Sequence, residues 1–500
     1  MSVVAAFAVP HPPLIIPGVA PDKREEISRT VASYQEVGRR IAALAPETLV
    51  ISSPHAEMYL DYLHVSGGIG TRGSFARFGA PRARYEVRYD EPFVRTLCRE
   101  AQEAGIPAGT EGERSPELDH GTMIPLHFVR EAWEAAQAEG SLPVDTPFPR
   151  VVRMGISGLS PLDHYRMGQA VQRVAEELGR RVVYVASGDL SHKLLPDGPY
   201  GFAAEGPEFD QDACEAFRTG DFLRLLALEP SFCERAAECG LRSFQIMAGA
   251  LDRTPVAPEL LSYEGPFGVG YGVAAFAVTG PVGSAPERGF ASAYETWHAG
   301  RMRELREGED PWVELARRTL EAYVRDDASV PTGEGGVPRA ASLLDALAAE
   351  GRLPEAVRVE LEGTRAGCFV SIKKNGQLRG CIGTTGPTRS SLAEEICGNA
   401  VAAGTRDPRF GAITADELPE LVYDVDVLGT PEPVDSTAAL DCRRYGVIVS
   451  TADGRRGLLL PDLDGVDSVE EQVRIAARKG GIDLGADRVR LERFTVTRHL

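Results

Sequence analysis

The chain has 500 residues, more than one hydrophobic core of ordinary size holds, so at least two domains are expected. Its 43% hydrophobic and 25% charged residues are typical of a globular protein. With 73 acidic and 54 basic residues, the formal net charge of −19 argues against nucleic acid or an anionic membrane as the main partner, because both need a basic face. A neutral or cationic small molecule, or another protein, fits this charge better.

Cysteine usage and the N-terminus indicate the compartment. The 8 cysteines form no CxxC pair and no clustered framework, which is typical of a reducing environment. The strand-like VVAAFAV follows Met1 without a basic segment, unlike a signal peptide. No apolar run approaches the ~18 residues of a membrane helix. We therefore predict a cytoplasmic protein with no membrane partner.

Residues 1–280 alternate short apolar runs with amphipathic segments. The runs are rich in Val and Ile, as strands buried on both faces are. They are Val3–Val9, Thr48–Ser53, Val151–Ile156 and Val182–Ala186. Helical periodicity falls between them, at Lys23–Leu44, Phe93–Ala104 and Tyr165–Leu178. This order predicts an α/β domain with a doubly wound, mostly parallel sheet.

A second domain is expected after a linker. Composition shifts to Gly, Pro, Ser and charged residues over 281–311, which we interpret as the linker. Residues 312–500 open with a helical stretch, WVELARRTLEAYV, and contain a hairpin turned at Asn375-Gly376. Its strands are expected at Cys368–Lys373, Gln377–Ile382, Leu421–Leu428, Gly446–Ser450 and Gly457–Leu460. The pattern predicts a smaller α+β domain.

Histidines gather at one predicted edge of the first domain. His11, His55 and His192 each follow a different predicted strand, and His120 begins a predicted helix. One such histidine is usually an ordinary loop residue, but in an open α/β sheet the carboxyl ends of the strands converge on the ligand site. The set therefore indicates a metal or catalytic site.

A metal site of two imidazoles and a carboxylate needs a third ligand. The candidates are Glu57, Glu238, Cys239 and Glu264. Glu57 is too close to His55 in sequence to be a convincing ligand, and Glu264 could equally cap backbone in a turn. Glu238 and Cys239 precede an apolar helical stretch, where an anion suits either a metal or the helix N-terminus.

Four motifs carry a resemblance to a known family. They are His-Pro-Pro at His11, Pro-His at His55, Asp-His-Gly at His120, and Gly-Asp-Leu-Ser-His ending at His192. Together they resemble the class III extradiol ring-cleavage dioxygenases (LigB type), whose fold the Memo proteins share. The resemblance implies Fe(II) bound by His11 and His55, with His192 as catalytic acid/base and His120 assisting it in the substrate pocket.

The third ligand separates two implied functions. Ring-cleaving relatives have Glu at this position and Memo-like proteins have Cys-Gly, whereas this chain reads Glu238-Cys239-Gly240. Glu238 favours Fe(II), with an aromatic substrate and O₂ as partners. Cys239, a soft thiolate, favours copper or zinc. The expected function is an extradiol-type dioxygenase acting on a catechol-like molecule; a Memo-like metal or redox component without ring cleavage, or a metal-binding module without turnover, stays open.

The second domain carries its own signature. The segment GCFVSIKKNGQLRGCIGTTG (Gly367–Gly386) resembles the core of the AMMECR family, the A protein of the AmmeMemoRadiSam system. Arg379 and Cys381 could line a cleft there, or could serve packing alone; Arg406 and Arg409 could bind an anion or tie loops together. The resemblance implies a radical SAM protein as a partner, and the oligomeric state, a homo-oligomer included, stays open.

Overall fold

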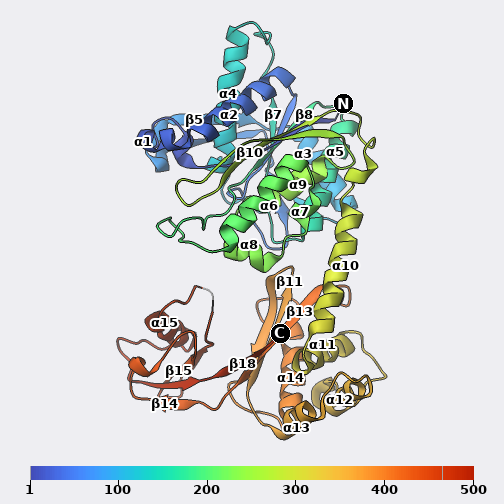
Figure 1. Cartoon of the computed structure of the whole chain (residues 1–500), viewed down its shortest axis with the longest axis vertical. Coiled ribbons are helices and arrows are strands. Elements are labelled where there is room, and N and C mark those ends of the chain that lie inside the picture. Colours follow the sequence, from blue (N-terminus) through green and yellow to red (C-terminus); the bar gives the residue numbers. More distant parts are fainter. Residues whose placement is uncertain (1, 464) are drawn as a thin grey trace. The chain divides into compact units, whose positions relative to one another are not determined.

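The computed structural model describes residues 2–463 and 465–500, and the chain divides into two compact units, 1–299 and 300–500 (Figure 1). Segment 281–311, interpreted as a linker, contains helix α10 (Ala291–Gly308), which runs across the division. Among the described residues no helix is both long and apolar enough to cross a membrane. All eight cysteines are free.

Unit 1 is built on a mostly parallel sheet, as predicted. The strand order is β7-β2-β8-β1-β10-β9; the first four strands are parallel to one another, β10 pairs antiparallel with β1, and β9 pairs antiparallel with β10. The strands are β1 (Val3–Val9), β2 (Thr48–Ser52), β7 (Arg150–Met154), β8 (Val182–Ser187), β9 (Val256–Glu264) and β10 (Tyr271–Val278).

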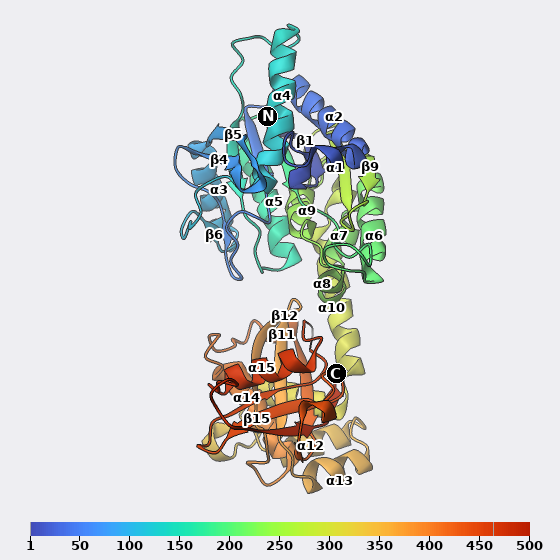
Figure 2. The ribbon, with the colours of Figure 1, turned by 90° about the vertical axis from the view of Figure 1, so that its left-hand side faces the viewer.

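Helices cover both faces of this sheet, because the central strands β1, β2 and β8 bury both of their sides. In β1, Ala6 and Ala8 enter one core while Phe7 and Val9 enter the other. Helices α2 and α4, side by side in Figure 2, cover the Phe7 face, and α3, α5, α6 and α9 cover the opposite face. The helices of unit 1 are α1 (Pro21–Arg24), α2 (Ser28–Leu44), α3 (Glu91–Glu103), α4 (His120–Ala138), α5 (Pro161–Glu177), α6 (Glu205–Thr219), α7 (Leu223–Leu226), α8 (Pro230–Ala236) and α9 (Leu241–Ala250).

Two small strand pairs accompany the main sheet. The antiparallel hairpin of β4 (Gly70–Phe75) and β5 (Ala80–Arg88) joins no strand of that sheet, and β3 (Leu63–His64) pairs with β6 (Ala108–Gly109). The stretch 75–81 thus forms the turn of a hairpin.

Unit 2 is α+β with antiparallel sheets, also as predicted. One sheet has the order β12-β11-β13-β18 and the other β14-β17-β15-β16. The strands are β11 (Cys368–Lys374), β12 (Gln377–Gly383), β13 (Leu421–Leu428), β14 (Glu432–Val434), β15 (Gly446–Thr451), β16 (Arg456–Leu459), β17 (Val489–Phe494) and β18 (Val496–His499). Helices α11 (Pro311–Val324), α12 (Ala340–Ala349) and α14 (Leu392–Thr405) share a core with the first sheet; α13 (Glu355–Gly363) packs on α14, and α15 (Val469–Lys479) packs on the second sheet.

Candidate metal centre

The candidate site lies at the carboxyl ends of three neighbouring strands. Strands β2, β8 and β1 are adjacent and parallel, so the loops after their carboxyl ends meet at one edge of the sheet. His11 follows β1, His55 follows β2, and Asp189 and His192 follow β8. Side chains distant in sequence therefore come together there.

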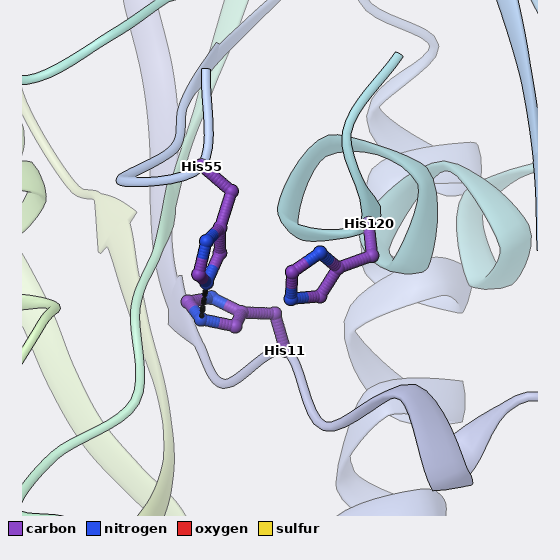
Figure 3. A group of neighbouring side chains, drawn as sticks. All are labelled: His11, His55 and His120. Atoms are coloured by element: carbon purple, nitrogen blue, oxygen red, sulfur yellow. Dashed lines mark hydrogen bonds between the residues drawn. The ribbon is translucent and has the colours of Figure 1, made fainter. Parts of the chain in front are cut away.

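His11, His55 and His120 form a cluster. One ring nitrogen from each lies within 4.8 Å of the others, and Nε2 of His55 is 3.0 Å from Nε2 of His11 (Figure 3). His120, from the first turn of α4, faces His55 with ring centroids 4.1 Å apart. The ring of His120 lies 5.4 Å from that of His11, so the structure brings all three histidines within reach of one metal ion.

The orientation of His11 is set by a serine. Ser187 at the end of β8 donates its hydroxyl proton to the carbonyl of Gly121, at 2.7 Å. Its oxygen then accepts from Nδ1–H of His11, at 3.2 Å. We infer from this network that Nε2 of His11 carries the lone pair and faces the other histidines. A hydrogen bond from the other ring nitrogen is typical of a metal-binding imidazole, because it fixes the tautomer and the ring orientation.

The electrostatics favour neutral imidazoles. Burial, followed by the proximity of His55, holds the pKa of His11 well below its usual range. Burial and the two neighbouring histidines lower the pKa of His120 to about 3. Neutral imidazole is the form that coordinates a metal, so near pH 7 the cluster offers lone pairs without first losing protons.

A second group of ligand atoms shares His11. Sγ of Cys239 lies 3.6 Å from Nε2 of His11, and Oδ2 of Asp189 lies 3.8 Å from that same nitrogen. Oδ1 of Asp189 accepts the backbone N–H of His11 at 2.6 Å. Burial, then the charge of Asp189, raises the pKa of the Cys239 thiol well above its usual range. A bound metal would therefore have to replace a proton on this sulfur.

Close backbone contact places Cys239 there. A Cβ at Gly188 would lie 2.1 Å from Cα of Gly240, so only glycine permits this approach. The backbone N–H of Gly240 donates to the carbonyl of Asp189 at 3.0 Å. These contacts hold the loop before α9 against the end of β8.

Glu238 is directed elsewhere. Its Oε2 accepts the backbone N–H of Leu241 at 2.7 Å, which satisfies a free donor in the first turn of α9. Among the described residues it belongs to neither group of clustered ligand atoms. Of the two neighbours that the sequence left open, Cys239 is the one brought to His11.

His192 lies beside the cluster with one nitrogen committed. Its Nδ1 forms a short hydrogen bond to the carbonyl of Ala237, which leaves Nε2 free to accept a proton. Nε2 is 3.9 Å from Oδ2 of Asp189, and the side chain is 18% exposed. The exposed ring of Tyr200 packs edge-on against it, with centroids 5.2 Å apart.

A buried ion pair holds the start of helix α4, where His120 lies. Asp119 caps α4 by accepting from the backbone of Thr122 at 2.9 Å, and it accepts from the Ser53 hydroxyl at 2.6 Å. Arg153, only 1% exposed, reaches Asp119 Oδ2 at 3.1 Å. Although burial opposes ionisation, Arg153 and these hydrogen bonds hold the pKa of Asp119 below its usual range.

The sequence motifs that contain Asp189 and Asp119 predict roles for their histidines only. Asp189 stands inside Gly-Asp-Leu-Ser-His, and Asp119 precedes His120 in Asp-His-Gly. A carboxylate within three residues of a motif histidine is the signal that the sequence offers. Arg153 had none, because it sits within an apolar strand.

In unit 2, Arg379 is fully engaged. Its guanidinium makes two 2.9 Å hydrogen bonds to the carboxylate of Glu417 and a third, also 2.9 Å, to the carbonyl of Gly411. Cys381 is half-buried, and Asp407, held by Arg409 at 2.7 Å, accepts its backbone N–H at 2.9 Å. These contacts tie the loop after α14 to strand β12.

The Arg379–Glu417 pair predicts a pH dependence for unit 2. Although burial opposes ionisation, Arg379 lowers the pKa of Glu417 to about 2. A depressed carboxyl pKa stabilises the fold above about pH 5, and this contribution is lost as the pH falls through about 4 towards 2. In calorimetry, Glu417→Gln should therefore lower the unit 2 transition at pH 7 and flatten its decline below pH 5. An exposed-pair control, Glu432→Gln, should leave that decline intact; equal pH profiles in all three proteins would contradict the assignment.

Two family models match this chain, one over each unit. Residues 5–274 match the family model described as the catalytic LigB subunit of aromatic ring-opening dioxygenase, and residues 313–499 match AMMECR1. A protein of Clostridium acetobutylicum is 35% identical over 509 residues, covering 100% of this chain and 99% of that protein. A Thermotoga maritima protein is 47% identical over 193 residues, 38% of this chain and 98% of its own length. A solved Pyrococcus horikoshii structure covers 38% of this chain and 91% of its own, with 26% identity and a TM-score of 0.31.

The LigB family model spans more than half of the chain, over the unit that holds the clustered histidines. The chain belongs to the LigB family of ring-opening dioxygenase catalytic subunits over its first unit, and carries an AMMECR1 domain as its second.

Proposed function

We propose that unit 1 is a mononuclear, Fe(II)-dependent dioxygenase that opens the ring of a catechol-like small molecule. One observation carries this proposal: three ring nitrogens lie within 4.8 Å of one another at the edge where an α/β sheet binds ligands. The donor set fits a divalent transition metal, because burial lowers the pKa of all three imidazoles and His11 is oriented by Ser187.

His11 and His55 would hold the metal, with His120 and Cys239 within reach of His11 on either side. When bound, Fe(II) supplies open positions for O₂ and for the two oxygens of a catecholate. The protein's own contribution is orientation and proton transfer, at a site where His11 is buried and His55 is exposed.

His192 would act as the acid/base. Because Nδ1 is committed to the Ala237 carbonyl, Nε2 can take a phenolic proton and later return it. Asp189 lies close enough to that nitrogen, at 3.9 Å, to stabilise the imidazolium formed in between. Partial exposure of His192 allows exchange of the proton with solvent.

Oxygen uptake tests this function. Protein purified without oxygen and loaded with Fe(II) should consume O₂ with at least one member of a catechol panel and give a ring-opened semialdehyde. His192→Gln should lower that rate by about 10²–10⁴-fold with iron content unchanged. The matched control His298→Gln, at a half-buried position outside the cluster, should keep the wild-type rate. No uptake by the wild type would refute ring opening, and undiminished uptake by His192→Gln would refute its role.

A second candidate function has its own support. The approach of the Cys239 sulfur to His11, while Glu238 caps a helix, favours a softer metal such as copper or zinc. The protein would then be a cytoplasmic Memo-like redox or modification component, with a radical SAM protein as partner, and would bind metal without catechol-dependent oxygen uptake.

A further inference from the structure

Unit 1 contains a cavity that the metal chemistry does not use. It has a volume of about 690 Å³, within the range typical of small-molecule sites. Four arginines, two glutamates and an apolar wall line it. The lining residues are Ala45, Pro46, Glu47, Glu86, Val87, Arg88, Arg130, Thr146, Pro147, Phe148, Pro149, Arg150 and Arg180.

The cavity lies at the opposite edge of the sheet from the histidines. Parallel strands β2 and β7 begin at Thr48 and Arg150, next to lining residues Glu47 and Pro149. His55 instead follows the other end of β2. A ligand in the cavity would therefore be separated from the metal centre by the length of the strands.

Two of the four arginines differ from the others in their side-chain contacts. Among the described residues, the exposed side chains of Arg88 and Arg150 make no ion pair and no hydrogen bond. Arg88 stands on the solvent face of β5, because Val87 beside it is buried in the core. Their guanidinium groups are available to a ligand.

The other two arginines are held in place. Arg130 donates to the carbonyl of Glu86 at 2.9 Å and lies 5.4 Å from the centre of the Phe148 ring. Arg180 reaches Glu47 at 3.4 Å, and its Nε, which has no hydrogen-bond partner in the described part of the chain, lies 3.8 Å from Oδ2 of the buried Asp90. Preorganised guanidinium groups lose little freedom when they bind an anion.

The lining of the cavity has more arginines than glutamates, whereas the protein as a whole is negatively charged. Four arginines face two glutamates, and Glu47 is already occupied by Arg180 and by the backbone N–H of Arg181, at 3.0 Å. The whole chain carries −19. A long polyanion such as nucleic acid would be repelled outside the cavity, so a small anion is the ligand that this charge pattern favours.

We propose that this cavity binds a small phosphorylated metabolite. The planar guanidinium fork matches phosphate oxygens two at a time, so unpaired Arg88 and Arg150 would hold the phosphate while Arg130 and Arg180 frame it. Phe148 with its flanking prolines, and Val87, offer an apolar wall to the organic part of the ligand. The proposal is independent of the metal and of the ring-opening function.

Calorimetric titration of the full-length protein with inorganic pyrophosphate tests the site. The wild type should show saturable binding, and Arg88→Gln/Arg150→Gln should weaken it at least about tenfold, since each removed group makes charge-assisted bonds. Because both side chains are exposed and unpartnered, the double variant should fold normally. The matched control Arg29→Gln/Arg95→Gln changes the net charge equally at exposed positions outside the cavity and should bind within about twofold of the wild type.

Two further titrations isolate the cause. Pyrophosphate also chelates metals, so His11→Ala is titrated in parallel and should bind as the wild type does. Citrate, a polycarboxylate without phosphate, should bind more weakly than pyrophosphate. Absence of wild-type binding at millimolar pyrophosphate, equal weakening in both double variants, dependence on His11, or tighter binding of citrate would each overturn the proposal.

Discussion

His11→Ala should remove the metal from the protein. His11 is the one residue shared by both groups of ligand atoms, the three histidines and the set with Asp189 and Cys239. Its loss therefore breaks either coordination that unit 1 can offer. Elemental analysis of anaerobically purified protein should find about one metal per chain in the wild type, and metal affinity should fall by more than about 100-fold in the variant.

Neighbouring variants identify the third ligand in the same analysis. Cys239→Ser should lower metal content, whereas Glu238→Gln should retain it, because a glutamine oxygen can still accept the N–H of Leu241. Iron would support the dioxygenase, and copper or zinc the Memo-like alternative. His298→Ala serves as the control. Wild-type metal content in His11→Ala would contradict the proposed centre, and loss of metal in Glu238→Gln alone would restore Glu238 as the ligand.

Arg153→Met should destabilise unit 1 strongly. Arg153 is 1% exposed and pairs with Asp119, so its removal leaves a carboxylate buried beside the histidine cluster without its cation. Breaking a buried pair on one side costs about 3–5 kcal/mol. Calorimetry should show the unit 1 transition several degrees lower with the unit 2 transition unchanged.

Two companion variants test the reason for this loss. Arg173→Met removes a half-exposed arginine paired with Glu100 at 3.0 Å, and should cost less than about 1 kcal/mol. Adding Asp119→Asn to Arg153→Met removes the stranded charge and should recover part of the stability. A double variant less stable than Arg153→Met would show that lost packing, rather than an unpaired charge, dominates.

Much of the architecture is legible in the residue pattern. Continuous Val-rich runs predict β1, β2, β7 and β8 as strands buried on both faces, and the structure confirms each within a residue or two at its ends. The Asn375-Gly376 turn predicts the hairpin of β11 and β12. Local patterns suffice here because period and turn chemistry act within a few residues.

For the candidate metal centre, the sequence predicts the location of the histidines but not the choice between Glu238 and Cys239. The sequence places His11, His55 and His192 after predicted strands. Because the carboxyl ends of parallel strands lie at one edge of a sheet, these histidines are expected there. Whether Glu238 or Cys239 faces His11 depends on the contact of Gly188 with Gly240 and on the start of α9, which are pairings between distant segments. Adjacent loop residues point in different directions, so no local pattern resolves that choice.

Arg153 and the arginine cavity belong to the tertiary structure for the same reason. In the sequence, Arg153 only interrupts the apolar run that forms β7. Its role follows from the structure, where Asp119 at the start of α4 pairs with it. Arg88 and Arg150 come from separate strands and line one cavity only where the hairpin of β5 lies beside the start of β7. Sequence periodicity predicts local conformation. Which distant side chains come together depends instead on which helices and strands pack against each other, and the burial of apolar surface over the whole unit decides that packing.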